Sequence, residues 1–436
     1  VTDGDIRRAI LSDTDLDEMI EKIMNVNYVS LPIDSPEHLI RSSLSDDIKL
    51  IPLVDENGYI ADVASAKSFR NIPISKPVLS GRESEYVHEC LTSNWVSSQG
   101  PFVQRFEKLF EDHHPFRHAI TTSNGTTALH LALVALGVGP GDEVIVPDLT
   151  FAATINSVIN TGPTPVMCEV DIDSWCIDFV EAEKLINDKT KAIMPVHLYG
   201  QVANMDALES LLSRHDLLLI EDCAEALGSS WHGKPAGTFG DAATFSFFGN
   251  KIITTGEGGM VLFKDPNVAE HAKVLRDHGM NKNIKYWHEF VGVNYRLTNI
   301  QAAIGVAQME QFNNIISKKR IIADAYKQDL QLISAIDCLP GDVDGSWNTF
   351  WLYTIRLKSS YSPQEVISDL LKLGIGARPI FYPLHLMPPY EKYKTSDSLE
   401  ISKKISRTGI SLPSSVDLDH GTVKFISKKL RGLLEK

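Results

Sequence analysis

The chain of 436 residues carries 42 basic and 56 acidic side chains, a net charge of −14, with 43% apolar and 22% charged residues. These proportions are typical of a globular protein of two or three domains, and the acidic excess argues against a general nucleic-acid or membrane-surface binder. The five cysteines are odd in number and include no CxxC pair. We therefore expect reduced thiols in a cytoplasmic protein, with neither a disulfide framework nor a metal site. No apolar run approaches the roughly 20 residues of a membrane helix.

The first 70 or so residues predict a small α+β module. The stretch "TDGDIRRAIL" indicates a turn followed by a helix, and "YVSLPID" indicates a strand. The stretch "IKLIPLVDENGYIADVAS" indicates two strands joined by turn residues 55–58. Pro73 and Pro77 then interrupt the chain, and a different pattern follows.

From about residue 80, short apolar runs alternate with helical stretches. The runs "HAITTS", "EVIVPD", "TPVMCEV", "AIMPVHL" and "LLLIED" predict strands that end in polar residues. This alternation predicts an α/β fold in which helices cover a mostly parallel sheet. The stretch "NGTTALHLALVALG" predicts a helix with Ser123 as its N-cap and Gly137 just beyond its end.

The domain organisation follows from the same pattern. We place the module at residues 1–71 and the large domain at residues 72–330. The large domain is expected to end in one long helix that runs from Thr298 to about Leu330. A smaller C-terminal α+β domain is expected at residues 331–436.

A single lysine stands out in the stretch "FSFFGNKIITTGEGG". Lys251 lies between an aromatic run and a glycine cluster. A partly desolvated lysine amine can form a Schiff base with a carbonyl compound. Taken alone, however, Lys251 fits an ordinary solvated loop lysine better, because most lysines are exposed.

Three further stretches complete one kind of site. Asp222 ends the run "LLLIED", where a carboxylate could pair with the pyridine nitrogen of pyridoxal 5′-phosphate (PLP). Gly125 and Thr126 begin a helix whose free N–H groups could hold a phosphate, to which the Ser246 hydroxyl could be added. Phe151 could stack on the ring.

Each of these residues also has an ordinary explanation. A strand-end acid, a plain helix start and a core phenylalanine are all common. Together, however, they supply the parts of a PLP site in a compatible order, which chance gives only rarely.

These stretches carry a resemblance to a known family. From about Ile72 to its end, the chain resembles the DegT/StrS-type nucleotide-sugar aminotransferases, which are fold-type I PLP enzymes. The stretches that match include "SNGTTALHLAL", "PVHLYGQVANMDAL", "IEDCAEALGS", "FSFFGNKIITTGEGGM" and "VGVNYRLTNIQAAIG".

The resemblance implies a role for particular residues. It implies that Lys251 binds PLP covalently, that Asp222 holds the pyridine nitrogen and that Phe151 stacks on the ring. It implies a phosphate site at Gly125, Thr126 and Ser246, and it places Glu225 near the phenolic oxygen. It also implies a homodimer with shared active sites, because Asn294 falls where the family sends an asparagine to the neighbouring subunit's phosphate.

Within the family, the stretches "KYWHEFVGVNYRLTNIQAAIG" and "ARPIFYPLHLMPPY" most resemble the members that form GDP-perosamine, a sugar of lipopolysaccharide O-antigens. The resemblance implies amino transfer from L-glutamate to C4 of GDP-4-keto-6-deoxy-D-mannose. The residues that it places near the sugar nucleotide are Trp95, Tyr286, Trp287, His288, Arg378, Tyr382 and His385.

Residues 1–71 resemble part of a CBS-domain pair, with the first repeat cut short. Such pairs often bind adenine nucleotides, but a docking or vestigial module fits the truncated pattern at least as well. Three alternatives to the main function stay open at this point. They are the same chemistry on a UDP- or dTDP-linked keto-sugar, a PLP-dependent sugar dehydratase, and a silent regulator that senses a nucleotide.

Overall fold

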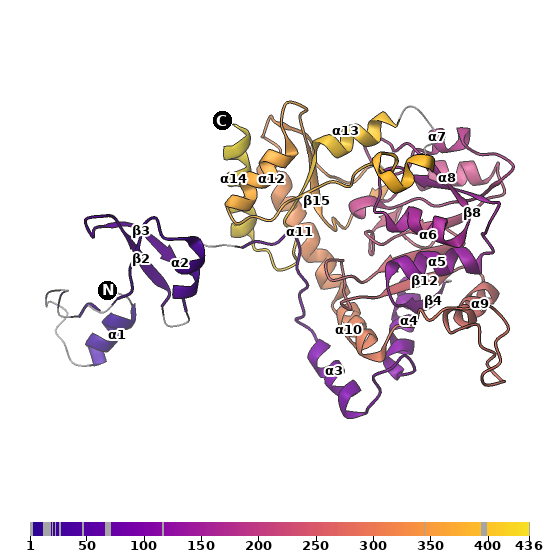
Figure 1. Ribbon diagram of the computed structural model, residues 1–436, viewed down its shortest axis with the longest axis horizontal. Helices are drawn as coiled ribbons and strands as arrows, with labels where there is room; N and C mark the ends of the chain where they lie inside the picture. Colours follow the sequence, from indigo (N-terminus) through magenta and orange to yellow (C-terminus); the bar gives the residue numbers. More distant parts are fainter. Residues whose placement is uncertain are drawn as a thin grey trace. The chain divides into compact units, whose positions relative to one another are not determined.

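The computed structural model describes residues 3–11, 19, 21, 23–25, 28–45, 48–65, 71–115, 117–343, 345–393 and 399–435. The chain divides into two compact units, Val1–Ile72 and Pro73–Lys436 (Figure 1). Each unit is described by itself below.

In its described residues, the N-terminal unit contains a three-stranded sheet and the helices α1 (Asp3–Leu11) and α2 (Glu37–Ser43). Strand β2 (Leu50–Val54) lies in the middle, parallel to β1 (Leu31–Pro32) and antiparallel to β3 (Ile60–Ser65). Its small core contains Ile40, Ile51, Leu53 and Ala64. The predicted pair of strands around turn 55–58 is confirmed, but the strand predicted from "YVSLPID" is only two residues long.

The larger unit is built on a seven-stranded sheet in the order β4-β12-β11-β8-β7-β5-β6. Six strands run parallel, and β12 alone of the seven runs antiparallel to both of its neighbours. The prediction of a mostly parallel sheet is therefore confirmed. The strands are β4 (His118–Thr122), β5 (Glu143–Pro147), β6 (Thr164–Cys168), β7 (Thr190–Ile193), β8 (Leu218–Asp222), β11 (Ala242–Ser246) and β12 (Gly259–Phe263).

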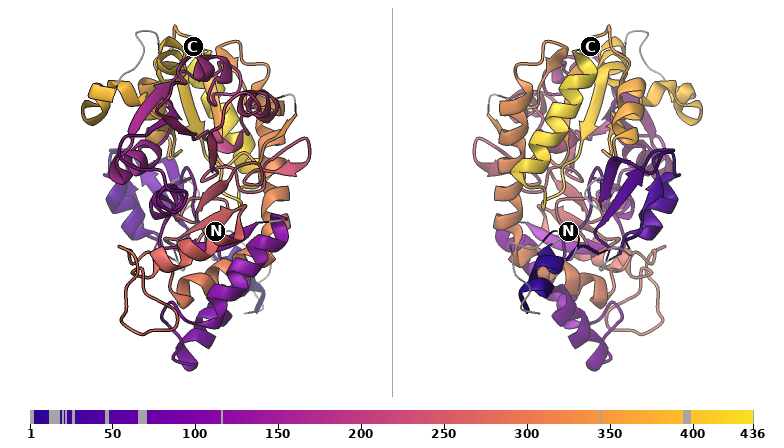
Figure 2. Two further views of the ribbon diagram at one scale, coloured as in Figure 1. Left: turned by 90° about the vertical axis from the view of Figure 1, so that its right-hand side faces the viewer. Right: turned by 90° about the vertical axis from the view of Figure 1, so that its left-hand side faces the viewer.

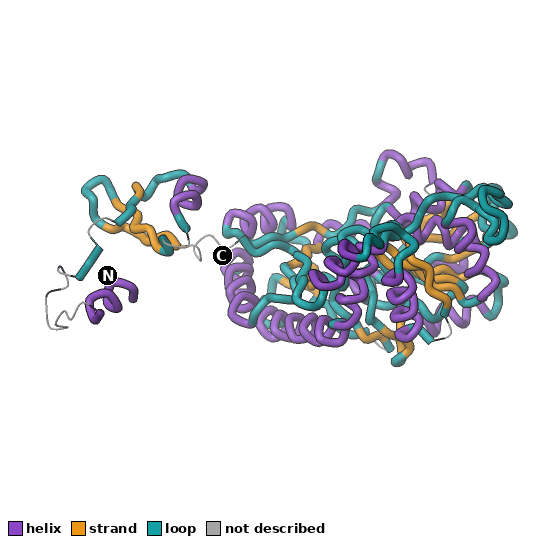
Figure 3. The backbone as a smooth tube through the Cα atoms, turned by 90° about the horizontal axis from the view of Figure 1, so that it is seen from below, coloured by secondary structure: helices purple, strands orange, loops and turns teal. Residues whose placement is uncertain are grey.

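Helices cover both faces of this sheet, and the strands lie between them in Figure 3. One core joins the sheet to α5 (Gly125–Ala135), α6 (Ala153–Thr161) and α9 (Pro266–Arg276). The other core joins it to the helices of the opposite face, and two such layers are what a parallel sheet needs to bury both of its faces. The helices of that second layer are α4 (Pro101–His113), α7 (Phe179–Lys184), α8 (Met205–Leu212) and α10 (Asn299–Glu310).

The long helix predicted from Thr298 to about Leu330 is in fact two helices. Helix α10 ends at Glu310, Gln311 leaves the helical conformation, and α11 runs over Phe312–Leu330. The physical reason is packing, because α10 lies against α3 (Glu83–Thr92) and α4 whereas α11 lies against α14 (His420–Leu434). The expected single helix was wrong because hydrophobic periodicity does not register a change of partner.

The C-terminal part contains a four-stranded sheet in the order β13-β15-β17-β16. Helices α12 (Pro363–Lys372) and α14 accompany it, as Figure 2 shows from two sides. The division at residue 330 stays a prediction, because β14 pairs across it with β9 in a separate sheet. The remaining elements are β9 (Ser230–Trp231), β10 (Lys234–Pro235), β13 (Ile336–Cys338), β14 (Ser346–Trp347), β15 (Tyr353–Leu357), β16 (Arg378–Pro379), β17 (Gly409–Leu412), α13 (Glu400–Thr408), and the 3₁₀ helices η2 (Leu198–Gly200), η3 (Leu384–Leu386) and η4 (Pro388–Tyr393).

The cap of α5 differs from the prediction by one residue. Asn124, not Ser123, is the N-cap, and its side chain accepts the N–H of Thr127 while Thr127 accepts the N–H of Asn124 in return. The Asn124 amide oxygen satisfies one free N–H at the start of the helix, and the Thr127 hydroxyl satisfies the other. Gly137 follows the end of the helix with φ +74°, as predicted. Among the helices that the structure describes, none is long and apolar enough to cross a membrane.

Candidate active site

Two neighbouring carboxylates at the end of β8 lie in different surroundings. Glu221 and Asp222 follow one another in the strand, so their side chains point to opposite faces of the sheet. Asp222 is 4% exposed and accepts two hydrogen bonds, from Thr154 Oγ1 at 2.9 Å and from the N–H of Ala224 at 3.2 Å. Burial raises the pKa of the Asp222 carboxyl, and the Thr154 hydroxyl and the Lys251 charge offset this only in part. A buried carboxylate in this state gains from any cation brought beside it.

Glu221 is instead fully satisfied by donors. It accepts the backbone N–H groups of Gly237, Phe239 and Gly240, and its Oε2 lies 3.1 Å from Nε2 of His197. Burial pushes the pKa of Glu221 upward, but His197 and these N–H groups outweigh burial and lower it. His197, Glu221 and Cys223 are near enough to hold a metal, yet donors already occupy both Glu221 oxygens and burial holds the pKa of Cys223 well above its usual value. The cluster therefore reads as a structural network.

Lys251 lies in the segment that follows β11. Its side chain is 14% exposed, with Nζ 3.4 Å from Oε1 of Glu225 and 3.8 Å from the ring centroid of Trp351. Glu225 is buried, and its Oε2 accepts the N–H of Tyr199 at 2.9 Å. Burial raises the pKa of Glu225, and the Lys251 charge offsets part of that rise. The lysine is thus held by protein groups and does not extend into solvent.

The start of α5 lies against the end of β11. A Cβ placed on Gly125 would lie 2.8 Å from Cβ of Ser246, so only glycine allows this approach. The N–H groups of Gly125 and Thr126 are the first two of the helix and have no partner within it. Together with the Ser246 hydroxyl, they form a set of donors suited to an anion.

A row of aromatic rings leads from the site into the core. Phe151, whose side chain is 58% exposed, lies 5.8 Å from Phe381 between ring centroids. Phe381 stacks on Tyr199 at 5.4 Å, and Tyr199 stacks on Trp351 at 5.9 Å. Sequence analysis missed Tyr199 and Trp351, because nothing in the local pattern of either residue distinguishes it from a core aromatic. Only the fold brings residues 152 positions apart into one stack (351 − 199).

Most of the residues predicted near the sugar nucleotide lie at the surface. Their contacts do not join them to Lys251 within the part of the chain that the structure describes. The exposed members are Trp95, Tyr286, Trp287, His288, Arg378 and Tyr382, and Asn294 is exposed as well.

His385 is placed differently from the other predicted substrate residues. Its side chain is buried, with Nδ1 2.7 Å from Oδ2 of Asp148 and its backbone N–H donating to Oδ1 of the same carboxylate. This pairing fixes η3 to the short segment between β5 and Phe151, in which Asp148 lies. The predicted contact of His385 with a sugar nucleotide stays a prediction, and the sequence could not show its pairing because Asp148 is 237 positions away.

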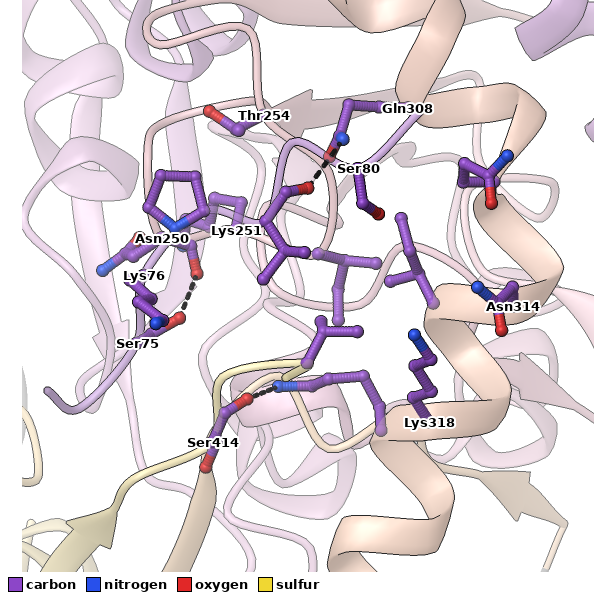
Figure 4. Close-up of a pocket in the computed structure, with 17 residues that line it drawn as sticks. Ser75, Lys76, Ser80, Asn250, Lys251, Thr254, Gln308, Asn314, Lys318 and Ser414 are labelled. Carbon is purple, nitrogen blue, oxygen red and sulfur yellow. Dashed lines mark hydrogen bonds between the residues drawn. The ribbon is translucent and has the colours of Figure 1, made fainter. Parts of the chain in front are cut away.

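A small cavity is lined in part by Lys251 and its neighbours Asn250 and Ile252 (Figure 4). Its volume of about 30 Å³ leaves room for about one water molecule. Neither Glu225 nor Trp351 lines it, so the Lys251 ammonium that contacts them points elsewhere. The polar residues around it include Ser75, Asn250, Gln308, Lys318 and Lys319.

The fold and the site together define the class of protein. The chain has a mostly parallel sheet covered on both faces. Its site combines a lysine held by protein groups, a buried carboxylate with few hydrogen bonds and an anion site at a helix start. These features are typical of an α/β enzyme that depends on PLP. The family model of the DegT/DnrJ/EryC1/StrS aminotransferases matches residues 77–431. The chain belongs to this family.

Individual relatives agree with the family match. The chain is 47% identical over 354 residues to the GDP-perosamine synthase of Caulobacter vibrioides, covering 81% of this chain and 95% of that protein. It is 44% identical over 360 residues to the GDP-perosamine synthase of Escherichia coli O157:H7, covering 82% and 97%. The structure of Helicobacter pylori PseC, an aminotransferase of pseudoaminic acid biosynthesis, superimposes with a TM-score of 0.80 at 28% identity, covering 84% of this chain and 100% of that one.

These findings confirm the predictions of a sugar aminotransferase and of PLP as its cofactor. The residues present fit that cofactor. Among the described residues, Asp222 accepts hydrogen bonds from only a hydroxyl and a backbone N–H, Phe151 presents an exposed ring, and the start of α5 offers N–H donors with no partner in the helix. The resemblance of residues 1–71 to a CBS pair stays a prediction.

Proposed function

We propose that the protein transfers the amino group of L-glutamate to C4 of GDP-4-keto-6-deoxy-D-mannose, and so forms GDP-perosamine. The geometry of Lys251 carries the proposal: the amine is held beside Glu225 and Trp351, away from bulk solvent. The relatives from Caulobacter vibrioides and Escherichia coli, each matched over most of its length, carry the name of that synthase and support the substrate.

The binding residues have separate tasks in this proposal. Asp222 holds the pyridine nitrogen of PLP. The positive charge of the protonated nitrogen lowers the energetic cost of keeping the Asp222 carboxylate buried and charged. Gly125, Thr126 and Ser246 hold the phosphate, and Phe151 stacks on the ring. Glu225 lies near the phenolic oxygen, where its contact to Lys251 orients the amine.

When bound, PLP supplies an electron sink and a temporary carrier for the amino group. Lys251 binds it in the resting enzyme, and its freed amine acts as general base and acid. It takes the proton from Cα of glutamate in the first half of the reaction. In the second half it returns a proton to C4 of the sugar. Because 2-oxoglutarate leaves before the sugar nucleotide binds, double-reciprocal plots are expected to be parallel.

The assembly proposed is a homodimer in which Asn294 serves the neighbouring subunit. The segment between α9 and α10 exposes large apolar side chains, which a monomer rarely leaves uncovered. They are Ile284 (56%), Tyr286 (77%), Trp287 (60%), Phe290 (46%) and Val291 (99%). The exposed Trp95, His288, Arg378 and Tyr382 contact the sugar nucleotide in this proposal, and the protein acts in the cytoplasm.

The chemistry is tested with purified protein, PLP, L-glutamate and GDP-4-keto-6-deoxy-mannose, with mass spectrometry of the product. The wild type is expected to give a 4-amino sugar, Lys251→Ala none, and Lys264→Ala, which changes an exposed lysine beyond β12, as much as the wild type. Amination of a UDP- or dTDP-linked sugar instead would refute the substrate. A deoxygenated product would indicate a dehydratase, and the absence of a PLP absorbance band would refute the enzyme itself.

The shared site is tested by mixing two inactive variants. Lys251→Ala and Asn294→Ala are each expected to be inactive alone. In a hybrid dimer, one of the two sites receives both intact residues, so random exchange should restore about a quarter of wild-type activity. Recovery of no activity in a mixture shown to contain hybrids would refute the shared site.

A further inference from the structure

Trp351 contacts both Lys251 and a second, fully buried lysine. The Lys251 ammonium lies 3.8 Å from its ring centroid, and Nζ of Lys319 donates to its carbonyl oxygen at 2.6 Å. Trp351 is itself 5% exposed, and its Nε1–H donates to the carbonyl oxygen of Asn250 at 2.7 Å. Asn250 immediately precedes Lys251, so one side chain contacts the ammonium and the backbone of the same segment.

Among the described residues, the hydrogen-bond partners of Lys319 are backbone carbonyls. It is 4% exposed and donates to the oxygens of Trp351 and Ser414, both at 2.6 Å (Figure 4 shows the bond to Ser414). Its hydrogen bonds to described residues include no carboxylate, and burial lowers the pKa of Lys319 to about 7. A buried lysine is costly. Here the two hydrogen bonds of Lys319 connect α11 to Trp351 and to the segment that follows β17, and they offset part of that cost.

The backbone before Trp351 is also held in an uncommon conformation. Phe350 has φ +53°, a region that bulky side chains rarely occupy, and its N–H donates to Oδ1 of Asn348 at 2.6 Å. Such a conformation persists only where surrounding contacts enforce it. The place of the Trp351 ring is therefore determined from several directions.

From these contacts we infer that Trp351 is a positioning residue for Lys251: once the freed lysine has taken a proton, the ring face holds its side chain beside Glu225, and Lys319 fixes Trp351 in place from α11. This inference rests on the proposed role of Lys251. Lys251 is released from the cofactor in each half of the reaction. Its contacts with Trp351 and Glu225 then hold the side chain in the same position each time. Glu225 and Asp222 are the acidic groups that act on Lys251 there, and Trp351 adds attraction without adding a further charge.

The test uses cofactor-free protein, so it does not depend on catalysis. Lysines are labelled with acetic anhydride at a series of pH values, and the rate at Lys251 is read by peptide mass spectrometry. At neutral pH, Trp351→Leu is expected to label at Lys251 roughly 3- to 30-fold faster, because the ammonium loses its ring contact. Trp351→Phe keeps a ring face and is expected to stay within about threefold of the wild type.

The pH series separates this effect from simple access. If the ring only shields Lys251, its removal raises the labelling rate equally at every pH. If the ring stabilises the ammonium, the difference disappears at high pH, where the lysine is uncharged with or without the ring. A uniform increase, or no increase, would overturn the inference.

Two matched controls test its specificity. Trp347 also has a cation over its ring, Arg320 at 4.8 Å, yet Trp347→Leu is expected to leave Lys251 labelling unchanged. Lys319→Met is expected to raise it, whereas Lys318→Met, which changes the exposed neighbour, is not. An equal effect of the two tryptophan variants would count against Trp351.

If Trp351→Leu fails to fold, protein grown with 5-fluorotryptophan gives the same information. Fluorine weakens the attraction of the ring face for a cation with little change in shape. Labelling of Lys251 at neutral pH should rise, and an unchanged rate would overturn the inference. The proposed function can fail separately, since Lys251→Ala could still bind PLP and form product whatever the labelling of the wild type shows.

Discussion

The two faces at the end of β8 differ more than their neighbouring residues suggest. Glu221 on one face accepts three backbone N–H groups and faces His197, whereas Asp222 on the other accepts one hydroxyl and one N–H. The contrast shows how a buried carboxylate with a full set of hydrogen-bond donors differs from one with few donors. The first carboxylate is complete and stabilises the fold, whereas the second is left with capacity for a cationic ligand. Three substitutions and one pH series test this difference.

The largest effect is expected from Asp222→Asn. The amide keeps the shape but cannot hold a pyridine nitrogen protonated, so kcat should fall about 10³-fold. The measurement is the rate of 4-amino-sugar formation at saturating PLP, with circular dichroism to show that the variant is folded. A loss below tenfold would mean that Asp222 is no more specialised than Glu221.

Glu221→Gln is expected to lower stability and to leave catalysis mostly intact. The buried His197 pairing is broken and an oxygen acceptor is replaced by an amide N–H₂ donor that faces backbone N–H groups. The free energy of unfolding should fall by about 3–5 kcal/mol, measured by urea denaturation, while molecules that remain folded keep most of their activity. Glu209→Gln, which changes an exposed residue of α8, is the matched control and should change stability by less than about 0.5 kcal/mol. A Glu221 variant as stable as the control would remove the structural half of the comparison.

Phe151→Leu should have a smaller effect, confined to the ligand face. Loss of the stacking ring is expected to weaken PLP binding about 3- to 10-fold, measured by the absorbance of the bound cofactor during titration. Phe425→Leu, on α14, serves as the control and should leave PLP affinity unchanged. Equal affinities for wild type and Phe151→Leu would show that the exposed ring is not part of the site.

The smallest effect concerns pH in the cofactor-free protein. The pKa of folded Asp222 lies above its usual 3.8, so the stability that this group contributes is present at low pH and is lost as pH rises from about 4. The pKa of Glu221 lies below its usual 4.5, so its contribution is present above about pH 4.5 and is lost as pH falls below that value.

The two variants should therefore depend on pH in opposite ways. Relative to the wild type, Asp222→Asn should gain stability as pH rises above about 4. The deficit of Glu221→Gln should shrink as pH falls below about 4.5. Urea unfolding from about pH 2.5 to about pH 8 covers both windows, and slopes of the same sign would contradict the assigned pKa directions.

Much of this molecule could be predicted from local pattern. The apolar runs that became β4, β5, β6, β7 and β8 were recognisable, as were the helix start at Gly125 and the strand-end acid Asp222. What the local pattern could not show depended on distant partners. The break at Gln311 reflects two different packing partners, and the burial of His385 reflects its pairing with Asp148.

The order of the main strands and helices, the family, and the positions of Lys251 and Asp222 along the chain could be read from the sequence. Those features depend on residue type and short spacing, which a linear chain contains in full. Folding in three dimensions sets which of the two adjacent carboxylates accepts the full set of hydrogen bonds, and it brings Trp351 and Lys319 next to Lys251. Such contacts join residues as much as 100 positions apart (351 − 251), and burial and hydrogen-bond satisfaction are properties of the packed chain.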